Sequence, residues 1–549
     1  MKGIGTSAGI AVGKAFIVNK DISIEKAIIS DSESEIARLI KAVNESERQL
    51  DAFLLKLRDE GNADSIEILR VHKAMLNDME FISSIKSFII DESVNSEFAV
   101  QMAAKRISDS LRTTDDAYLK ERAFDIEDVG NRIICNLSGG FPDFSSIPEE
   151  SVIVTKYLSP SDAAAIDKCR LKGFVTEEGS STSHTAIIAR TAGIPAVTGI
   201  DGIVGAVRNG DIIIVDGFKG EVILNPGEDT INLYKAKKLE HKEYRDKLKK
   251  LKNLPAVTLD GREFIIEANI GSGTDVGEVL NSGAQGIGLF RTEFVYMNSS
   301  DFPSEDDQFY EYKKVVSKMG QKRVTIRTLD IGGDKELPYF RLDKEAKPSI
   351  CNGGIRFCLE RKDIFKTQLK AILRAGVYGN VSIMYPMITD VSEVIRANRV
   401  LEEAKTELKL DMVPFCDDIK VGIMIETPAA AMSAHILARE VDFFSIGTND
   451  LIQYTLATER SSRTEACNDY LNADVLRLIR DCICQAHKHG IYAAMCGEMA
   501  SDPETVKILL GLGLDVFSMN PSAIPVIKDI IRSTTVEEAA KCACKALNE

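Results

Sequence analysis

This sequence lacks the features that mark three large classes of proteins. No run of 18 uninterrupted apolar residues occurs in it, which excludes a membrane-spanning helix, and its N-terminus shows no charged-then-apolar pattern, so secretion is not supported. Positive charge is not in excess: 68 lysines and arginines stand against 83 aspartates and glutamates, for a net charge of −15. Because nucleic-acid binding needs clustered lysine and arginine, the composition argues against DNA or RNA as the main partner.

Paired cysteines of the kind that bind metal are also missing. The chain has 11 cysteines but no C-x-x-C motif. Cys482 and Cys484, like Cys542 and Cys544, form C-x-C pairs within helix-like sequence, where residues two apart point to different faces, so we do not expect a metal site there. An odd number of scattered cysteines without a secretion signal predicts reduced thiols and a cytoplasmic protein.

At 549 residues, the chain is too long for one compact core. Glycine-punctuated strand patterns occupy residues 1–20 and return at 145–225, and amphipathic helical patterns fill most of the interval between them. We therefore predict an α/β domain made of residues 1–20 and 145–225, with a helical domain of residues 21–144 inserted into it. Residues 226–255 are highly charged and predict a connecting helix about which one half of the chain can swing.

The predicted helical domain is acidic. Between residues 21 and 132 there are 24 acidic and 15 basic residues. One interpretation is a solvated surface with no specific partner. The other is a docking face for a basic protein.

The last 294 residues, 256–549, alternate apolar strand-like runs with helix-length segments. The strand candidates are REFIIEANI, GIGLFRTEF, RVTIRTLD, VSIMYPMI, KVGIMIETP, DFFSIGTND, YAAMCGEM and VFSMN. Eight alternations within this length predict a (β/α)8 barrel. The fold class is therefore predicted to be α/β and multidomain, with an α/β domain, an inserted helical domain and a TIM-type barrel.

Polar residues follow six of the eight predicted strands, namely Asn269, Arg291, Arg327, Glu426, Asn449–Asp450 and Cys496. Since the active site of such a barrel lies at the carboxyl ends of its strands, these residues predict a site for a charged small molecule. Arg291, Arg327 and Arg460 offer planar, permanently charged groups that suit phosphate and carboxylate oxygens.

Three of these residues have two interpretations each. Glu426 and Asp450 are hard oxygen donors of the kind that Mg²⁺ binds, but they can also form ion pairs with the arginines. Cys496 is either a small buried side chain or a thiol that donates or accepts a proton.

His184 lies in GSSTSHTAIIAR, residues 179–190, where a small polar loop runs into an apolar helical pattern. The stretch can be a capping loop with a surface histidine. Alternatively, the free N–H groups and the positive dipole end of the helix favour an anion and keep the imidazole neutral. A neutral histidine beside a bound phosphate can act as a phosphoryl acceptor.

Longer motifs resemble enzyme I, the phosphoenolpyruvate–protein phosphotransferase family of the bacterial sugar phosphotransferase system. They are TSHTAIIAR (182–190), GIGLFRTEF (286–294), TLDIGGDKELPY (328–339), ETPAA (426–430), FSIGTNDLIQY (444–454), MCGE (495–498), GLGLDVFSM (511–519) and, in the helical region, YLKERAFDIED (118–128). The resemblance runs from residue 1 to near the C-terminus. T-S-H by itself also occurs in pyruvate phosphate dikinase and phosphoenolpyruvate synthase.

The resemblance implies a phosphotransfer reaction, EC 2.7.3.9. His184 would accept the phosphoryl group of phosphoenolpyruvate, with release of pyruvate, and pass it to a histidine of the carrier protein HPr. The helical domain would dock HPr, and the barrel would bind phosphoenolpyruvate and form a homodimer. Because donor and acceptor sites lie in different domains, His184 would have to travel, which gives the connecting helix a purpose.

The resemblance also implies roles for the residues at the predicted strand ends. Phosphoenolpyruvate would be held by Arg291, Arg327, Arg460, Asn449 and Asp450. Glu426 and Asp450 would bind Mg²⁺, and Cys496 would protonate the enolpyruvate carbon.

Two alternatives differ in function. A dikinase or synthase would need an ATP-binding domain, for which the segment before His184 is too short. The other alternative is a degenerate enzyme I that binds phosphoenolpyruvate or the carrier as a regulatory protein. It rests on two departures from the family pattern: G-S-S, ending at Ser181, replaces G-G-R, and Gly353 replaces the first arginine of R-A-I-R, whose second arginine, Arg356, is retained.

Overall fold

The computed structural model describes most of the chain, namely residues 1–18, 24–60, 63–113, 117–139, 147–158, 166, 170–179, 189–190, 193–297, 299–332, 337, 339–340, 353–458 and 469–548. These residues divide into two compact units, Met1–Glu243 and Tyr244–Glu549. His184, Ser181 and Arg460, which the sequence analysis singled out, lie outside the described residues. None of the described helices has the length and apolar character needed to cross a bilayer.

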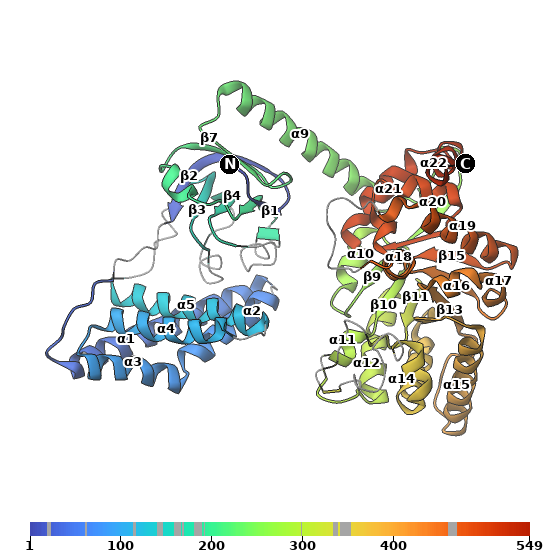
Figure 1. The fold of residues 1–549 in the computed structure, drawn as a ribbon, viewed down its shortest axis with the longest axis horizontal. Coiled ribbons are helices and arrows are strands. Elements are labelled where there is room, and N and C mark those ends of the chain that lie inside the picture. Colours follow the sequence, from blue (N-terminus) through green and yellow to red (C-terminus); the bar gives the residue numbers. More distant parts are fainter. Residues whose placement is uncertain are drawn as a thin grey trace. The chain divides into compact units, whose positions relative to one another are not determined.

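A seven-stranded mixed sheet forms the α/β part of the first unit (Figure 1), in the order β1-β5-β4-β3-β2-β6-β7. Its strands are β1 (Ile4–Ser7), β2 (Ile10–Val18), β3 (Ser151–Thr155), β4 (Leu171–Thr176), β5 (Ala196–Thr198), β6 (Ile212–Asp216) and β7 (Glu221–Leu224), and the short helix α8 (Ile203–Ala206) precedes β6. Strand β2 pairs in parallel with β3, from Lys14↔Ser151 to Val18↔Thr155. These two neighbouring strands are separated in the sequence by the whole helical region, which is therefore an insertion into this sheet.

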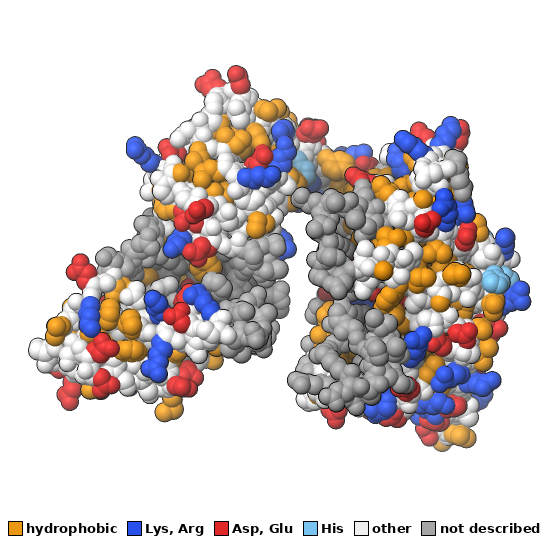
Figure 2. Space-filling model, in the orientation of Figure 1, with side chains coloured by type: hydrophobic (Ala, Val, Ile, Leu, Met, Phe, Trp, Pro, Cys, Tyr) orange, Lys and Arg blue, Asp and Glu red, His pale blue; other side chains and the backbone are white. Residues whose placement is uncertain are grey.

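Helices fill the interval between β2 and β3: α1 (Ser32–Glu60), α2 (Ala63–Leu76), α3 (Met79–Glu92), α4 (Ser96–Arg112) and α5 (Ala117–Leu137). In α3, Phe81, Ile85 and Ile89 recur every four residues and are buried, which is the period of an amphipathic helix. The Asp78 side chain accepts the Phe81 N–H at 2.8 Å and caps the helix start. On the face shown in Figure 2, acidic and basic side chains of these helices are interspersed, so the acidic excess does not form one patch there.

Helix α9 (Glu228–Leu251) occupies most of the predicted connecting segment. Tyr234, near its start, is buried and packs with Ile10 and Ile214 of the sheet. Near its C-terminal end, Lys247 pairs with Asp529 of the barrel unit at 2.7 Å. Each end of α9 therefore belongs firmly to one of the two units.

In the described residues of the second unit, eight parallel strands close into a barrel (Figure 1). They are β9 (Glu263–Ile270), β10 (Ile287–Arg291), β11 (Val324–Arg327), β12 (Val381–Tyr385), β13 (Lys420–Ile425), β14 (Phe443–Ile446), β15 (Tyr492–Met495) and β16 (Val516–Met519). The ring closes because β9 pairs with both β10 and β16, and β8 (Ala256–Val257) is added antiparallel to β9. All eight strands predicted from the sequence are present, and the predicted fold class is confirmed.

The strands are joined and covered by helices: α10 (Val276–Ser282), α11 (Glu293–Met297), α12 (Glu305–Met319), α13 (Ile355–Glu360), α14 (Lys362–Ala375), α15 (Val391–Leu410), α16 (Pro428–Met432), α17 (Ala434–Leu437), α18 (Thr448–Leu456), α19 (Ala473–Lys488), α20 (Val506–Leu512), α21 (Ile524–Arg532) and α22 (Val536–Leu547). Side chains alternate between the two faces of each strand. In β14, Phe444 and Ile446 join the large core cluster that also contains helix residues, whereas Phe443 packs in a separate cluster with Leu289 and Met424 from other strands. This second cluster also contains Cys496 and so lies directly against the predicted site.

Candidate active site

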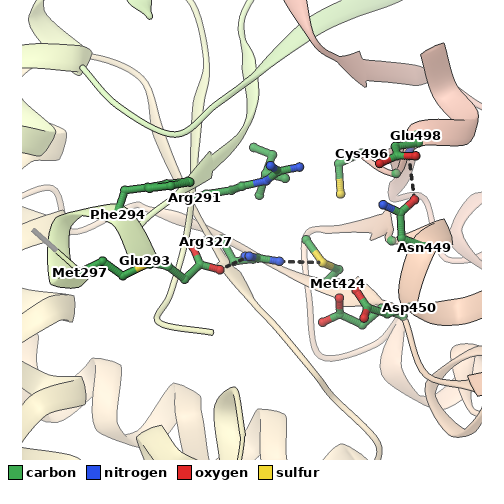
Figure 3. Close-up of a pocket in the computed structure, with 14 residues that line it drawn as sticks. Arg291, Glu293, Phe294, Met297, Arg327, Met424, Asn449, Asp450, Cys496 and Glu498 are labelled. Carbon is green, nitrogen blue, oxygen red and sulfur yellow. Dashed lines mark hydrogen bonds and ion pairs between the residues drawn. The ribbon is translucent and has the colours of Figure 1, made fainter. Parts of the chain in front are cut away.

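A cavity of about 340 Å³ opens at the carboxyl ends of the barrel strands (Figure 3). It is lined by Leu289, Arg291, Glu293, Phe294, Met297, Arg327, Met424, Glu426, Gly447, Asn449, Asp450, Cys496, Gly497 and Glu498. Six residues that the sequence analysis proposed for the site are therefore brought together: Arg291, Arg327, Glu426, Asn449, Asp450 and Cys496. Parallel strands place them on one rim, because all their carboxyl ends point the same way.

Arg327 ends strand β11 and is buried. Its guanidinium forms an ion pair with Glu293, at the start of α11, and a second one with Asp330 at 3.2 Å. Burial by itself would lower the pKa of Arg327, but attraction to Glu293, Asp330 and Glu426 outweighs it and raises the pKa. Arg327 therefore stays charged even though it is removed from water.

Arg291 ends the neighbouring strand, β10, and differs from Arg327 in its surroundings. Its side chain is exposed and lines the cavity. Within the described part of the chain, its guanidinium has no ion-pair partner. An exposed guanidinium without an ion-pair partner can bind a phosphate or carboxylate through two parallel hydrogen bonds.

Glu426 follows strand β13 directly and is buried. Its Oε1 accepts the backbone N–H of Met387 at 2.5 Å, whereas its Oε2 has no hydrogen-bond partner among the described residues. Burial, reinforced by the negative charges of Asp330 and Asp450, raises the pKa of Glu426 to about 8. Arg327 acts in the opposite direction with smaller effect, so this buried oxygen without a hydrogen-bond partner among the described residues remains short of positive charge.

The shortage of positive charge beside the Oε2 of Glu426 bears on whether the proposed metal ion fits this site. A divalent cation beside the Oε2 of Glu426 would supply the missing partner and offset the repulsion from Asp450. No group of three or more histidine, cysteine or acidic side chains suited to a metal occurs among the described residues. Two carboxylates are nevertheless enough for Mg²⁺, which is commonly held by one or two of them together with water and substrate phosphate. The residues present fit this ion.

Asn449 and Asp450 lie in the first turn of α18, which follows β14. The Oδ1 of Asn449 accepts the backbone N–H of Glu498 at 3.1 Å. This bond fixes the amide and leaves its nitrogen on the side of the cavity (Figure 3), where it can donate to an anion.

Cys496 follows strand β15 and is buried, with its Sγ 3.9 Å from the carbonyl oxygen of Ile446. Burial raises the pKa of the thiol, while Ser445 and Arg327 act in the opposite direction with smaller effect. The side chain therefore holds its proton at neutral pH and faces the cavity with it. The first interpretation from the sequence, a buried small side chain, matches the structure, and the second, a proton donor, stays a prediction.

Asn269 is the one residue of the predicted rim that does not line the cavity. Its Nδ2 donates to the carbonyl oxygens of Cys496, at 2.9 Å, and of Ser518, at 3.3 Å. It ties β9 to the ends of β15 and β16 and so holds the segment that carries Cys496.

Sequence reasoning missed several groups at this site. Glu293 and Asp330 set the charge state of Arg327, and Met387 holds Glu426 through its backbone. A signal was present for the two acids, because each follows a predicted strand end within three residues. Nothing in the local sequence pointed to Met387, because its contribution is a main-chain N–H.

The fold and the site together define a barrel enzyme whose arginine-rich and acidic strand ends serve a small anionic substrate. Comparison with known families agrees: the PEP-binding domain of PEP-utilising enzymes matches residues 245–536, their N-terminal domain matches 2–122, and their mobile domain matches 147–220. The chain is thus of the class of PEP-utilising enzymes.

Curated relatives cover nearly the whole chain. The phosphoenolpyruvate-protein phosphotransferase of Priestia megaterium is 45% identical over 97% of this chain and 93% of its own length. Relatives of the same name from Geobacillus stearothermophilus and Bacillus subtilis (strain 168) are each 44% identical over 98% of this chain, and over 94% and 95% of their own lengths. The chain belongs to the phosphoenolpyruvate-protein phosphotransferase family. The predicted family and its enzyme class, EC 2.7.3.9, are confirmed.

Proposed function

We propose that this protein transfers the phosphoryl group of phosphoenolpyruvate first to its own His184 and then to a histidine of the carrier protein HPr, as the first step of a sugar phosphotransferase system. The observation that carries the proposal is the cavity in which four kinds of group converge: an exposed arginine with no ion-pair partner among the described residues, a buried arginine, two carboxylates and a buried thiol. Each of these groups has a task in the transfer.

Arg291 and Arg327 bind the phosphate and carboxylate of phosphoenolpyruvate, with Arg460 and the amide of Asn449 as further donors. The roles of Arg291 and Arg327 differ because their surroundings differ. Arg291 presents an exposed fork, whereas Arg327 contributes a charge that is already fixed in place by Glu293. Preorganised charge of this kind stabilises a transferring phosphoryl group because no reorientation is needed during the reaction.

Glu426 and Asp450 would hold Mg²⁺, whose charge would offset that of the phosphate oxygens. The Oε2 of Glu426 has no protein partner among the described residues and would be available to the ion. The raised pKa of Glu426 belongs to the protein without the ion.

His184 and Cys496 carry out the bond changes at opposite ends of the substrate. The Nε2 or Nδ1 lone pair of His184 forms a bond to phosphorus while the bond between phosphorus and the enol oxygen breaks. The electrons left on the enolate move to its terminal carbon, which takes the Cys496 thiol proton and yields pyruvate. The resulting thiolate regains a proton from water, so the site returns to its starting state.

Different domains serve the transfer from phosphoenolpyruvate to His184 and the transfer from His184 to HPr. Residues 1–20 and 145–225 carry His184, the barrel of residues 256–549 binds phosphoenolpyruvate and forms a homodimer, and the helical domain of residues 21–144 docks HPr. Residues 226–255 let the histidine-bearing part swivel between its donor and its acceptor. We place the enzyme in the cytoplasm, where phosphoenolpyruvate is available.

The test is incubation of the full chain with phosphoenolpyruvate labelled on phosphorus and Mg²⁺. We expect a protein-bound label that is labile in acid and stable in base, as a phosphohistidine is. His184→Ala should abolish it, while His435→Ala, a change at an exposed histidine of α17, should leave it intact. Undiminished label on His184→Ala would contradict the assignment. Binding of phosphoenolpyruvate to the wild type without any label would favour the degenerate, regulatory alternative.

A further inference from the structure

Cys496, the proposed proton donor, stands one residue past the end of strand β15, which finishes at Met495. Its main chain is bonded to two other strands of the barrel. The Cys496 N–H donates to the carbonyl oxygen of Ile446, in β14, at 3.1 Å, and the Cys496 carbonyl oxygen accepts the Nδ2 of Asn269, in β9, at 2.9 Å. Its Sγ points toward the cavity (Figure 3). The direction of the thiol therefore depends on how these two bonds hold the main chain.

The residue after Cys496 gives this stretch of backbone little restraint of its own. Gly497 has no room for a side chain, because a Cβ atom there would lie 2.6 Å from the backbone nitrogen of Thr448. Glycine has more backbone conformations open to it than any other residue. The Cys496 carbonyl group belongs to the peptide that joins Cys496 to this glycine, so it needs a partner outside the segment to stay in one orientation.

The partner, the side-chain amide of Asn269, is itself fixed in orientation. Its Nδ2 donates to the carbonyl oxygen of Cys496 and, at 3.3 Å, to that of Ser518. Its Oδ1 accepts the Ser518 hydroxyl at 2.6 Å. Because carbonyl oxygens only accept hydrogen bonds, the amide nitrogen must face them, and only one of the two amide orientations satisfies all three contacts. The Ser518 hydroxyl thus locks the amide that holds the Cys496 carbonyl group.

The position of Ser518 follows from packing inside the barrel. Its side chain is fully buried. A Cβ atom at Gly288, in β10, would lie 2.6 Å from the Cβ of Ser518, a distance that real Cβ atoms do not show. The missing side chain of Gly288 therefore leaves the room that Ser518 occupies. The contacts run from β10 through β16 and β9 to the segment after β15, so four strands together determine where the thiol stands.

We propose that Asn269, locked by Ser518, is a positioning residue for Cys496, and that it fixes the face of the enolate carbon to which the thiol proton is delivered. This inference rests on the proposed role of Cys496 as proton donor. In that step the S–H bond breaks and its electrons stay on sulfur, the electron pair of the C=C bond takes the proton, and the enolate oxygen becomes the ketone oxygen of pyruvate. A thiol held in one place reaches only one face of the planar enolate.

The experiment follows the first turnover of the full-length protein in heavy water, with (Z)-3-fluorophosphoenolpyruvate as the probe. The product, 3-fluoropyruvate, carries hydrogen, deuterium and fluorine on its terminal carbon, so the face that received the deuteron can be identified. Lactate dehydrogenase and NADH convert this product at once to 3-fluorolactate, whose two diastereomers are resolved by fluorine NMR. We expect a single diastereomer from the wild type.

Asn269→Leu keeps the approximate volume of the side chain and removes the donor. We expect turnover of phosphoenolpyruvate to fall about tenfold to a hundredfold, because a misplaced reacting group loses rate steeply, and substrate affinity to stay near the wild-type value. Both diastereomers should then form from the fluorinated probe, since the enolate is also protonated by water from either face. A side chain that only fills space would leave the single diastereomer of the wild type.

Ser518→Ala is a milder change that decides the question even if Asn269→Leu fails to fold, as judged by circular dichroism. It removes one hydroxyl and frees the Asn269 amide to turn, so the second diastereomer should appear beside the first. The matched control is Ser282→Ala, which removes a buried hydroxyl of α10 that donates to the Val279 carbonyl oxygen of its own helix at 2.8 Å. This control should give a single diastereomer at the wild-type rate. A single diastereomer from Ser518→Ala and from every folded Asn269→Leu sample would overturn the proposal.

Cys496→Ala separates this inference from the proposed function on which it rests. If it yields both diastereomers while the variants of Asn269 and Ser518 yield one, Cys496 remains the proton donor and only the positioning role fails. If Cys496→Ala itself yields a single diastereomer, another group delivers the proton, and the role of Cys496 in the proposed function fails together with this inference.

Discussion

The guanidinium of Arg327 and the carboxylate of Glu293 form an ion pair from which water is almost excluded, each side chain being only 5% exposed. Arg327 is also held through its backbone, because its carbonyl oxygen accepts the Thr292 hydroxyl at 2.9 Å. The adjacent strand places Arg291 opposite Arg327 in the register of β10 and β11. Two arginines at equivalent positions therefore play unequal parts, one fixed by the protein and one exposed to the cavity.

Glu293→Gln should destabilise the protein strongly. It leaves the buried charge of Arg327 with Asp330 as its remaining close partner, and breaking a buried pair costs about 3 kcal/mol in the free energy of unfolding. Urea denaturation followed by circular dichroism suits this chain, which contains no tryptophan. The matched control is Glu537→Gln, whose partner Lys541 is exposed, and it should cost less than about 0.5 kcal/mol. Equal denaturation midpoints for the two variants would show that Arg327 does not depend on Glu293.

Arg291→Lys should act on substrate affinity and leave stability unchanged. The substitution keeps the charge but loses the planar fork, and a lost hydrogen bond to a charged group is worth about 1.5–3 kcal/mol, or about ten- to a hundredfold in affinity. Titration calorimetry with phosphoenolpyruvate measures the change. Arg361→Lys, at an exposed pair with Asp363, is the control and should bind as the wild type does. Normal affinity in Arg291→Lys would remove this residue from the binding site.

Cys496→Ala should lower turnover about 10²–10⁴-fold, because the enolate carbon loses its proton donor. Phosphoenolpyruvate affinity should stay within a few-fold of the wild-type value. Cys482→Ala removes a buried thiol of α19 instead and should leave turnover nearly unchanged. Pyruvate release measured in the first turnover separates proton transfer from later steps. A normal rate in Cys496→Ala would mean that this thiol serves packing only.

The raised pKa of the Cys496 thiol predicts how the rate of pyruvate release depends on pH. A proton donor works below its pKa, so a raised pKa extends the active range upward. Burial raises the pKa of Cys496 above its ordinary value of 9.0, and the rate of pyruvate release should therefore not fall on its account between pH 7 and 9. A loss of rate in that interval which disappears in Cys496→Ala would contradict the stated direction of the shift.

Gly353 stands where the resemblance to enzyme I predicts an arginine, and the structure places it in a cavity of about 150 Å³ with Arg356 and Thr427. A Cβ atom at this position would lie 2.8 Å from the carbonyl oxygen of Ile331, so any side chain there requires a backbone shift. Gly353→Ala carries this steric cost alone, whereas Gly353→Arg adds the charged fork. We expect kcat/KM for phosphoenolpyruvate to be at least about tenfold higher in Gly353→Arg than in Gly353→Ala. Equal values would show that the missing arginine carries no penalty in this protein.

Much of the barrel was predictable because its signals are local. Each predicted strand, such as GIGLFRTEF with β10 inside it, is an apolar run followed by a polar residue, and both the run and its end are visible in a few neighbouring residues. The residues that gather at the rim of the site could be predicted as well, since parallel strands bring their carboxyl ends to one rim whatever their side chains are. Asn269 shows the limit of this reasoning: it stands at a strand end like Arg291, but it bonds to the carbonyl oxygens of Cys496 and Ser518.

By itself, then, the sequence determined which elements form and which residues stand at their ends, because strand and helix periods depend on neighbours along the chain. Only the tertiary structure decided the state of each group at the rim. Arg327 is buried and paired with Glu293 of α11, whereas Arg291 on the neighbouring strand is exposed to the cavity. Glu426 presents a single oxygen because Met387, from another loop, takes the other. Charge and hydrogen bonding in a site depend on distance and on exclusion of water, and both arise when the barrel closes and brings distant segments together.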